Sequence, residues 1–171
     1  MDSVGTMAQL RFTAKGMAVT GTPLTGILAR LNFLLLHSAD SLAAATATVI
    51  MARYQPDTGT LTWARAGHLP PLLVRNGRAR YLDPPEGVLL GATHGARYAE
   101  ATITLREGDE VFLYTDGLIE RPGEDLGDSL TRLVHAVTAT PPTEPSLSDL
   151  VTALTAQGDR RDDVCVLRIT S

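Results

Sequence analysis

The sequence has one cysteine and no long apolar run, and both scarcities exclude classes of protein. A single cysteine, Cys165, cannot form an internal disulfide, so the chain is not a disulfide-stabilised scaffold. Because Cys165 lies in an apolar run, we expect its small side chain to be buried. No apolar stretch approaches the roughly 20 residues that span a bilayer, and the N-terminus lacks the basic-then-apolar order of a signal peptide. We therefore expect a cytoplasmic protein with no membrane partner.

Basic residues are scarce as well. The chain of 171 residues has 15 lysines and arginines against 19 aspartates and glutamates, which gives a net charge of −4. The basic residues are scattered and form no stripe of the kind that a phosphate backbone requires, so we expect no nucleic-acid partner. The length and the 44% hydrophobic content fit a single globular domain over residues 1–171.

Four segments repeat apolar residues at helical spacing. Gly21 marks the end of the first segment, and the second begins where Thr22 can cap a helix and Pro23 suits its first position. A proline-rich stretch over 140–145 breaks the third segment, and the fourth follows Ser146 as a capping residue. The helical periodicity covers residues 7–17, 24–35, 126–137 and 150–154.

The middle of the chain is rich in β-branched and apolar residues and predicts three consecutive β-hairpins. Asn76-Gly77 accepts the positive φ angles of a type I′ turn, and turns over 56–59 and 106–109 close the other two hairpins. The expected strands cover residues 46–54, 61–65, 72–75, 78–82, 97–105, 110–115 and 164–169. Helices and strands that are segregated along the chain indicate the α+β class, with mostly antiparallel sheets and helices outside.

Two groups of carboxylates lie beside strands that we expect to be buried. Asp116 follows the apolar run 111–114 after Thr115, where Gly117 lets the chain turn, and Asp162 and Asp163 directly precede the last strand. If the two strands are neighbours in one sheet, Asp116 approaches Asp162 closely, and a cation between them would offset the repulsion. Oxygen ligands without a His or Cys cluster favour Mg²⁺ or Mn²⁺. Taken singly, each motif also fits a structural turn or a solvated sheet edge.

Six blocks resemble one family, in order, along nearly the whole chain. They are MAQLR (7–11), ILARLNFLL (27–35), ATVIMARYQPDTGTLTWARAGHLPPLLV (47–74), LLGA (89–92), LREGDEVFLYTDGLIE (105–120) and DDVCVL (162–167). With these blocks the chain resembles the stage II sporulation protein E (SpoIIE) type of bacterial phosphatase domain, a branch of the metal-dependent type 2C (PPM) protein phosphatases. Six ordered blocks, including the unusual AGHLPPLL, would rarely coincide by chance.

The resemblance implies an αββα sandwich of two mostly antiparallel sheets, with two Mg²⁺ or Mn²⁺ ions held by carboxylates at one edge. The ions would direct a water molecule at the phosphorus of phosphoserine or phosphothreonine without a phosphoenzyme. By motif, Asp116 would be a metal ligand and Asp162 its partner, with Asp163 as the alternative, while Gly117 would support the turn. His68 would either hold the turn after its strand or contact the substrate. Family substrates are phosphorylated anti-sigma-factor antagonists in bacterial signalling.

One segment of the family pattern is missing. Family members carry a segment like GDVxGHG, whose aspartate bridges both metals, upstream of the methionine that matches Met7, and Asp2 is not at that spacing. We therefore expect an N-terminally truncated domain with an incomplete two-metal centre, at most one bound ion and negligible turnover. Absent strands would leave sheet edges unpaired, which favours a homodimer. Two functions remain open: a metal-dependent protein serine/threonine phosphatase domain, and a catalytically inactive, phosphatase-like binding module.

Overall fold

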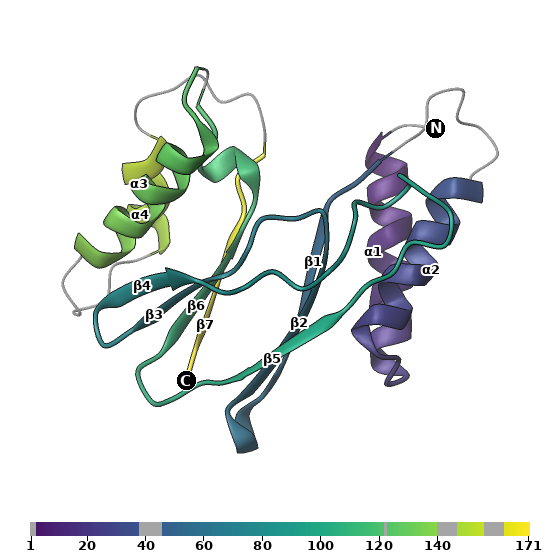
Figure 1. The fold of residues 1–171 in the computed structure, drawn as a ribbon, viewed down its shortest axis with the longest axis horizontal. Helices are drawn as coiled ribbons and strands as arrows, with labels where there is room; N and C mark the ends of the chain where they lie inside the picture. Colours follow the sequence, from purple (N-terminus) through teal and green to yellow (C-terminus); the bar gives the residue numbers. More distant parts are fainter. Residues whose placement is uncertain (1–2, 38–45, 122, 140–146, 156–162) are drawn as a thin grey trace. The chain divides into compact units, whose positions relative to one another are not determined.

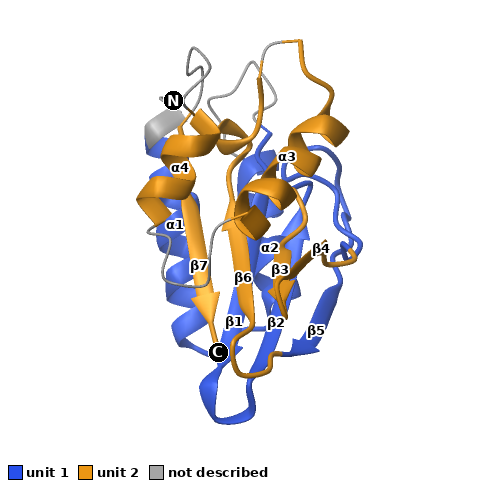
Figure 2. Ribbon diagram, turned by 90° about the vertical axis from the view of Figure 1, so that its left-hand side faces the viewer, with its two compact units in different colours: residues 1–68, 84–104 blue, residues 69–83, 105–171 orange. Residues whose placement is uncertain are grey.

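The computed structural model describes residues 3–37, 46–121, 123–139, 147–155 and 163–171. These residues form two compact units, which Figure 2 shows in different colours. Unit 1 comprises residues 1–68 and 84–104, and unit 2 comprises residues 69–83 and 105–171. The single domain over residues 1–171 stays a prediction.

Unit 1 combines two helices with a three-stranded antiparallel sheet (Figure 1). Its elements are α1 (Ser3–Val19), α2 (Leu24–His37), β1 (Val49–Gln55), the 3-10 turn η1 (Pro56–Thr58), β2 (Thr60–Ala66) and β5 (Glu100–Thr104). The strands lie in the order β1-β2-β5. On the inner face of α2, Ile27, Leu28 and Leu31 are at most 1% exposed. They share a core with Ala64 and Ala66 of β2, whose small side chains leave room for the bulky helix residues.

Unit 2 contains a four-stranded antiparallel sheet and two helices that cover one of its faces (Figure 1). Its elements are β3 (Leu72–Arg75), β4 (Arg78–Tyr81), β6 (Glu110–Tyr114), the 3-10 turn η2 (Asp116–Leu118), α3 (Leu126–Ala139), α4 (Leu147–Thr155) and β7 (Val166–Thr170). The strands lie in the order β4-β3-β6-β7. Leu133 of α3 and Leu154 of α4 join Leu72 and Phe112 of the sheet in one buried core.

Much of the predicted architecture is confirmed. Along the described residues, two helices, six strands, two helices and a last strand follow one another, as the sequence predicts. The α+β class with two antiparallel sheets and flanking helices is confirmed as well. Asn76 and Gly77 have φ angles of 51° and 71°, the positive values that a type I′ turn requires. No helix in the described part of the chain is long and apolar enough to cross a membrane.

The third predicted hairpin is wrong. β5 pairs with β2 in unit 1, whereas β6 pairs with β3 and β7 in unit 2. The segment 105–109 therefore leads the chain from one sheet to the other instead of closing a hairpin. Within it, Asp109 accepts hydrogen bonds from Arg75 of β3, which ties the start of β6 to unit 2. Two strands and a turn in a sequence do not reveal which sheet each strand joins.

The expectation of a buried Cys165 is also wrong, because this residue is exposed. Cys165 directly precedes β7, and successive residues of an extended chain point to opposite faces of the sheet. Val164 and Val166 pack against the unit 2 core, whereas Leu167 is 54% exposed. Cys165 and Leu167 are two residues apart, so they lie on the same face of the strand, and both are exposed. An apolar run can therefore have one exposed face.

Candidate metal site at the end of strand β6

The two acidic segments flank neighbouring strands of unit 2. β6 and β7 pair antiparallel, with Tyr114 opposite Val166. Asp116 follows β6 after Thr115, and Asp163 precedes β7, so both residues belong to the same end of this strand pair. The strand adjacency on which the predicted metal site depends is therefore confirmed.

Thr115 joins the two segments beyond the last paired residues of the strands. Its amide donates a hydrogen bond to the Cys165 carbonyl at 3.0 Å. Its hydroxyl lies 2.9 Å from the Asp163 carbonyl, to which it donates, and 2.9 Å from the Cys165 amide, from which it accepts. The residue before Asp116 is thus bonded directly to the backbone that carries Asp163. Asp162 lies outside the described residues.

A tight turn presents the Asp116 carboxylate. The Asp116 carbonyl accepts hydrogen bonds from the amides of Ile119 and Glu120, both at 2.8 Å, and its Oδ1 accepts one from the Gly117 amide at 2.9 Å. Leu118 and Ile119 are only 2% and 0% exposed, so the apolar side of the turn is anchored in the core. Asp116 itself is half-buried, and Glu120 is exposed. Gly117 contributes its amide, and its predicted supporting role stays a prediction.

The ligand chemistry at this edge fits a hard divalent cation. A carboxylate has about four lone-pair positions, and Asp116 uses one of them for the Gly117 amide. Asp163 is exposed at the same end of the strand pair. In the part of the chain that the structure describes, no three His, Cys, Asp or Glu residues form a group that could hold a metal ion. The described residues therefore place Asp116 and Asp163 at the same end of the strand pair, and their roles as ligands stay a prediction. Mg²⁺-type ions commonly use few carboxylates and keep several waters.

A different aspartate, Asp109, lies at the other end of β6 and is fully engaged by the protein. Asp109 is 2% exposed, and Arg75 Nε lies 2.9 Å from its Oδ1 and 3.0 Å from its Oδ2. Arg75 Nη2 and the Arg106 amide also donate to Oδ2, the amide at 2.8 Å. The hydrogen bonds from Arg75 hold the pKa of the Asp109 carboxyl below its ordinary value. This carboxylate is structural.

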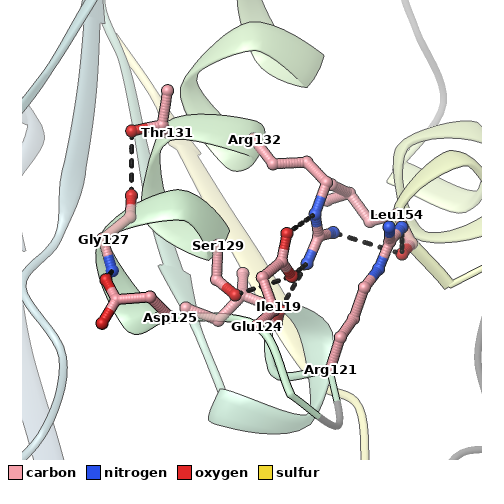
Figure 3. A network of polar contacts seen from close by, with 9 residues as sticks. All are labelled: Ile119, Arg121, Glu124, Asp125, Gly127, Ser129, Thr131, Arg132 and Leu154. Carbon is pink, nitrogen blue, oxygen red and sulfur yellow. Dashed lines mark hydrogen bonds and ion pairs between the residues drawn. The ribbon is translucent and has the colours of Figure 1, made fainter.

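An arginine network, which the sequence did not reveal, binds Ile119 at the end of the turn that begins at Asp116 (Figure 3). Arg132 of α3 donates through Nη2 to the Ile119 carbonyl at 2.5 Å and through Nη1 to the Leu154 carbonyl at 3.4 Å. The same Nη2 lies 2.8 Å from Oε2 of Glu124, which also accepts a hydrogen bond from the Ser129 hydroxyl at 2.9 Å. The Arg132 guanidinium thus connects the end of the Asp116 turn with the end of α4.

Arg121 strengthens this connection. Its Nη2 donates to the same Leu154 carbonyl at 3.1 Å. Hydrogen bonds from Arg132 and Ser129 hold the pKa of Glu124 below its ordinary value, so the anion that orients Arg132 stays ionised. From the sequence, an arginine in an amphipathic helix is expected to be solvated. The helical spacing of residues does not indicate that Arg132 donates to two distant carbonyls.

His68 belongs to unit 1, where its backbone helps to hold a turn. The His68 carbonyl accepts a hydrogen bond from Arg65 Nη1 at 2.7 Å. Next to it, Gly67 has a φ angle of 65°, and its amide donates to the Gly87 carbonyl at 2.9 Å. A Cβ atom at Gly67 would lie 2.7 Å from the Leu89 Cβ, so only glycine fits there. The bond from Arg65 involves the His68 backbone and not its imidazole, so both alternatives for His68 stay predictions.

Comparisons with known proteins agree on one family. The family model described as Stage II sporulation protein E (SpoIIE) matches residues 1–171. The phosphoserine phosphatase RsbU of Bacillus subtilis (strain 168) is 26% identical over 115 residues, which make up 67% of this chain and 34% of RsbU. The crystal structure of the RsbU and RsbW domains of Rv1364c from Mycobacterium tuberculosis is 28% identical, with a TM-score of 0.85, and the match covers 99% of this chain and 48% of that one.

The fold is also that of the SpoIIE phosphatase domain from Bacillus subtilis, in a structure presoaked with Mn. That match has a TM-score of 0.62 at 15% identity and covers 99% of this chain and 74% of that one. The present chain spans about a third of the length of RsbU and about half of the Mycobacterium tuberculosis chain. The match of the family model to residues 1–171 shows that the chain belongs to the Stage II sporulation protein E (SpoIIE) family.

Proposed function

We propose that this chain is a metal-dependent protein serine/threonine phosphatase domain. The observation that carries the proposal is the Asp116 carboxylate, which a tight turn presents at the same end of the β6–β7 pair as Asp163. Membership of a phosphatase family supports a phosphoester substrate, and the similarity to a phosphoserine phosphatase supports phosphoserine in particular.

Asp116, with Asp162 or Asp163, would hold Mg²⁺ or Mn²⁺ in this proposal. When bound, such an ion lowers the pKa of a coordinated water and supplies a nucleophile at neutral pH. The protein's own contribution is to keep the carboxylates in place: the turn fixes Asp116, and Thr115 fixes the backbone at Asp163. The Mn-presoaked SpoIIE structure supports the choice of cation.

The substrate that we propose is a phosphorylated anti-sigma-factor antagonist. The similarity to RsbU and to a chain with RsbU and RsbW domains supports a partner from this kind of bacterial signalling. Cytoplasmic location and a homodimer are part of the same proposal, and sedimentation of the purified chain would test the dimer.

Phosphate release from a phosphoserine peptide tests the proposed activity. If the phosphatase proposal holds, release depends on Mn²⁺ and falls at least about 100-fold in Asp116→Asn, because a ligand of the ion is lost. Glu120→Gln is the matched control, since it removes an exposed carboxylate four residues away and should leave the rate unchanged. Activity that survives in Asp116→Asn would overturn the assignment of this residue.

A second candidate is a catalytically inactive binding module. The observation that favours it is that the described residues contain no group of three metal-ligating side chains. Such a module would bind a phosphorylated antagonist protein with equal affinity in Mn²⁺ and in EDTA and would release no phosphate. Phosphate release by the unaltered chain would exclude this candidate.

A further inference from the structure

Arg132 contacts the turn that begins at Asp116 and the end of α4. Its guanidinium lies between the Ile119 carbonyl and the Leu154 carbonyl, as Figure 3 shows. Ile119 ends the turn that begins at Asp116, and its amide is bonded to the Asp116 carbonyl. Fixing the Ile119 carbonyl therefore fixes the turn that orients the Asp116 carboxylate.

The second contact joins Arg132 to α4. Leu154 is the penultimate residue of this helix. Two arginines, Arg121 and Arg132, donate to the Leu154 carbonyl. α4 also packs against η2. The distance between the end of α4 and the Asp116 turn is therefore set by hydrogen bonds as well as by apolar packing.

Only an arginine can make this set of contacts. A guanidinium is planar and carries five N–H donors in a fixed arrangement, whereas a lysine ammonium is a point charge on a flexible stem. Glu124 holds the Arg132 guanidinium, and Ser129 in turn holds Glu124. The Arg132 side chain is 21% exposed, so water competes only partly for these donors.

We propose that Arg132 is a positioning residue, whose guanidinium joins the Asp116 turn to the end of α4 and so holds the Asp116 carboxylate in the orientation that binds a divalent cation. The cation rests on the proposed function, whereas the fixed position of the turn rests on the contacts alone. Groups that orient metal ligands from outside the coordination sphere typically affect metal affinity 10- to 100-fold. We expect an effect of about tenfold for Arg132, because it acts through the backbone and not through the carboxylate itself.

A purely structural arginine would act differently, and the chain offers a matched control. Arg75 is also a unit 2 arginine that binds a carboxylate, but its partner Asp109 lies at the opposite end of β6. Arg75→Lys should lower the thermal stability of unit 2 without changing the affinity for Mn²⁺. Arg132→Lys should change both the affinity for Mn²⁺ and the mobility of the Asp116 turn.

Two measurements on the full chain test the proposal. In native-state hydrogen exchange, Arg132→Lys should speed exchange of the Ile119 and Glu120 amides about tenfold. Arg75→Lys should leave the exchange rates of these two amides unchanged relative to those of the other unit 2 amides. In calorimetric titration with Mn²⁺, Arg132→Lys should weaken binding about tenfold, and Arg75→Lys should stay within about twofold of the unaltered chain. If Arg132→Ala folds, millimolar guanidinium should restore part of the lost affinity.

The outcomes separate this proposal from the proposed function. Equal amide exchange in the unaltered chain and in Arg132→Lys would overturn the positioning role, whatever the activity. Equal loss of Mn²⁺ affinity in Arg132→Lys and Arg75→Lys would reduce Arg132 to a general stabilising residue and would also overturn the proposal. A chain that binds Mn²⁺ through an Arg132-dependent site but releases no phosphate would overturn the phosphatase function alone. If the unaltered chain binds no Mn²⁺, the cation site is overturned in this proposal and in the proposed function. Amide exchange would then still decide whether Arg132 positions the turn.

Discussion

The two ends of β6 carry aspartates in opposite states. Asp109, before the strand, is 2% exposed and accepts hydrogen bonds from the Arg75 side chain and the Arg106 amide. Asp116, after the strand, is half-buried, and its carboxylate accepts a hydrogen bond from the Gly117 amide. Because one strand separates them, both residues experience the same sheet and the same core, and they differ in the donors that surround them.

The comparison teaches how to separate a structural carboxylate from a candidate ligand. Donors supplied by the protein saturate Asp109, so a cation would have to displace an arginine to reach it. At Asp116 the protein fixes the backbone through the carbonyl, and among the described residues the Gly117 amide takes up one of the carboxylate's about four lone pairs. The arginine near Asp116, Arg132, binds the Ile119 carbonyl and not the carboxylate, so it fixes the turn without neutralising the acid.

The largest effect on stability should come from removing the Asp109 carboxylate at the start of β6. Asp109→Ala leaves Arg75 without its buried carboxylate and should lower the free energy of unfolding by about 3 kcal/mol, the lower end of the range for such pairs, since Arg75 is partly exposed. For a chain of this length that corresponds to a fall in Tm of roughly 9 °C. Thermal denaturation followed by circular dichroism measures it, and an unchanged Tm would show that the ion pair contributes nothing.

A core substitution should disturb the Asp116 turn, after β6, by removing an apolar side chain that holds the turn in the core. Leu118 is 2% exposed and belongs to the turn that begins at Asp116. Leu118→Ala should lower the free energy of unfolding by about 2.5 kcal/mol through lost packing, and in addition it should weaken Mn²⁺ binding. Denaturant unfolding and calorimetry on the same sample measure both effects. If stability falls but Mn²⁺ affinity does not, the turn does not control the candidate ligand.

Acidification should sharpen the comparison. The pKa of Asp109 is lowered in the folded protein, so its contribution to stability is present above the ordinary Asp pKa of about 3.9 and is lost as the pH falls through the lower folded value. Asp109→Asn should therefore be less stable than the unaltered chain at pH 7, and the difference should shrink below about pH 4. Unfolding curves of both chains, measured at intervals of about 0.5 pH unit between pH 3 and pH 7, test this. A constant difference would show that the Asp109 charge is not responsible.

The smallest effect should come from the bridge between the two acidic segments. Thr115→Val keeps the shape of the side chain but removes its hydrogen bonds to the Asp163 carbonyl and from the Cys165 amide. The expected loss is about 1 kcal/mol of stability, measured by urea denaturation. Ser at the same position restores the hydroxyl and is the control, so a loss of equal size in Thr115→Ser would assign the effect to packing.

The sequence predicted what depends on local patterns. The Asn76-Gly77 turn, the order of helices and strands, and the position of Asp116 at the end of a strand follow from periodicity and turn chemistry. Those signals are short in range, and the structure confirms each of them. The roles of Asp116, Asp162 and Asp163 as ligands stay predictions, although the strands that flank Asp116 and Asp163 are neighbours.

The sequence did not predict what depends on long-range pairing. β5 and β6 join different sheets, although they follow one another in the chain, because their partners lie far away in the sequence. The same limit hid the bonds of Arg132 to Ile119 and Leu154, 13 and 22 residues away. Cys165 was misjudged because an apolar run near a sheet does not reveal which of its faces is covered.

The most direct test of the account is a titration with Mn²⁺ of three chains: the unaltered protein, Asp116→Asn and Asp109→Asn, all at a temperature at which each is folded. The account predicts that Asp116→Asn loses Mn²⁺ binding and that Asp109→Asn, though less stable, binds Mn²⁺ like the unaltered chain. Binding that survives in Asp116→Asn, or that disappears in a folded Asp109→Asn, would contradict the assignment of one end of β6 to structure and the other to the metal.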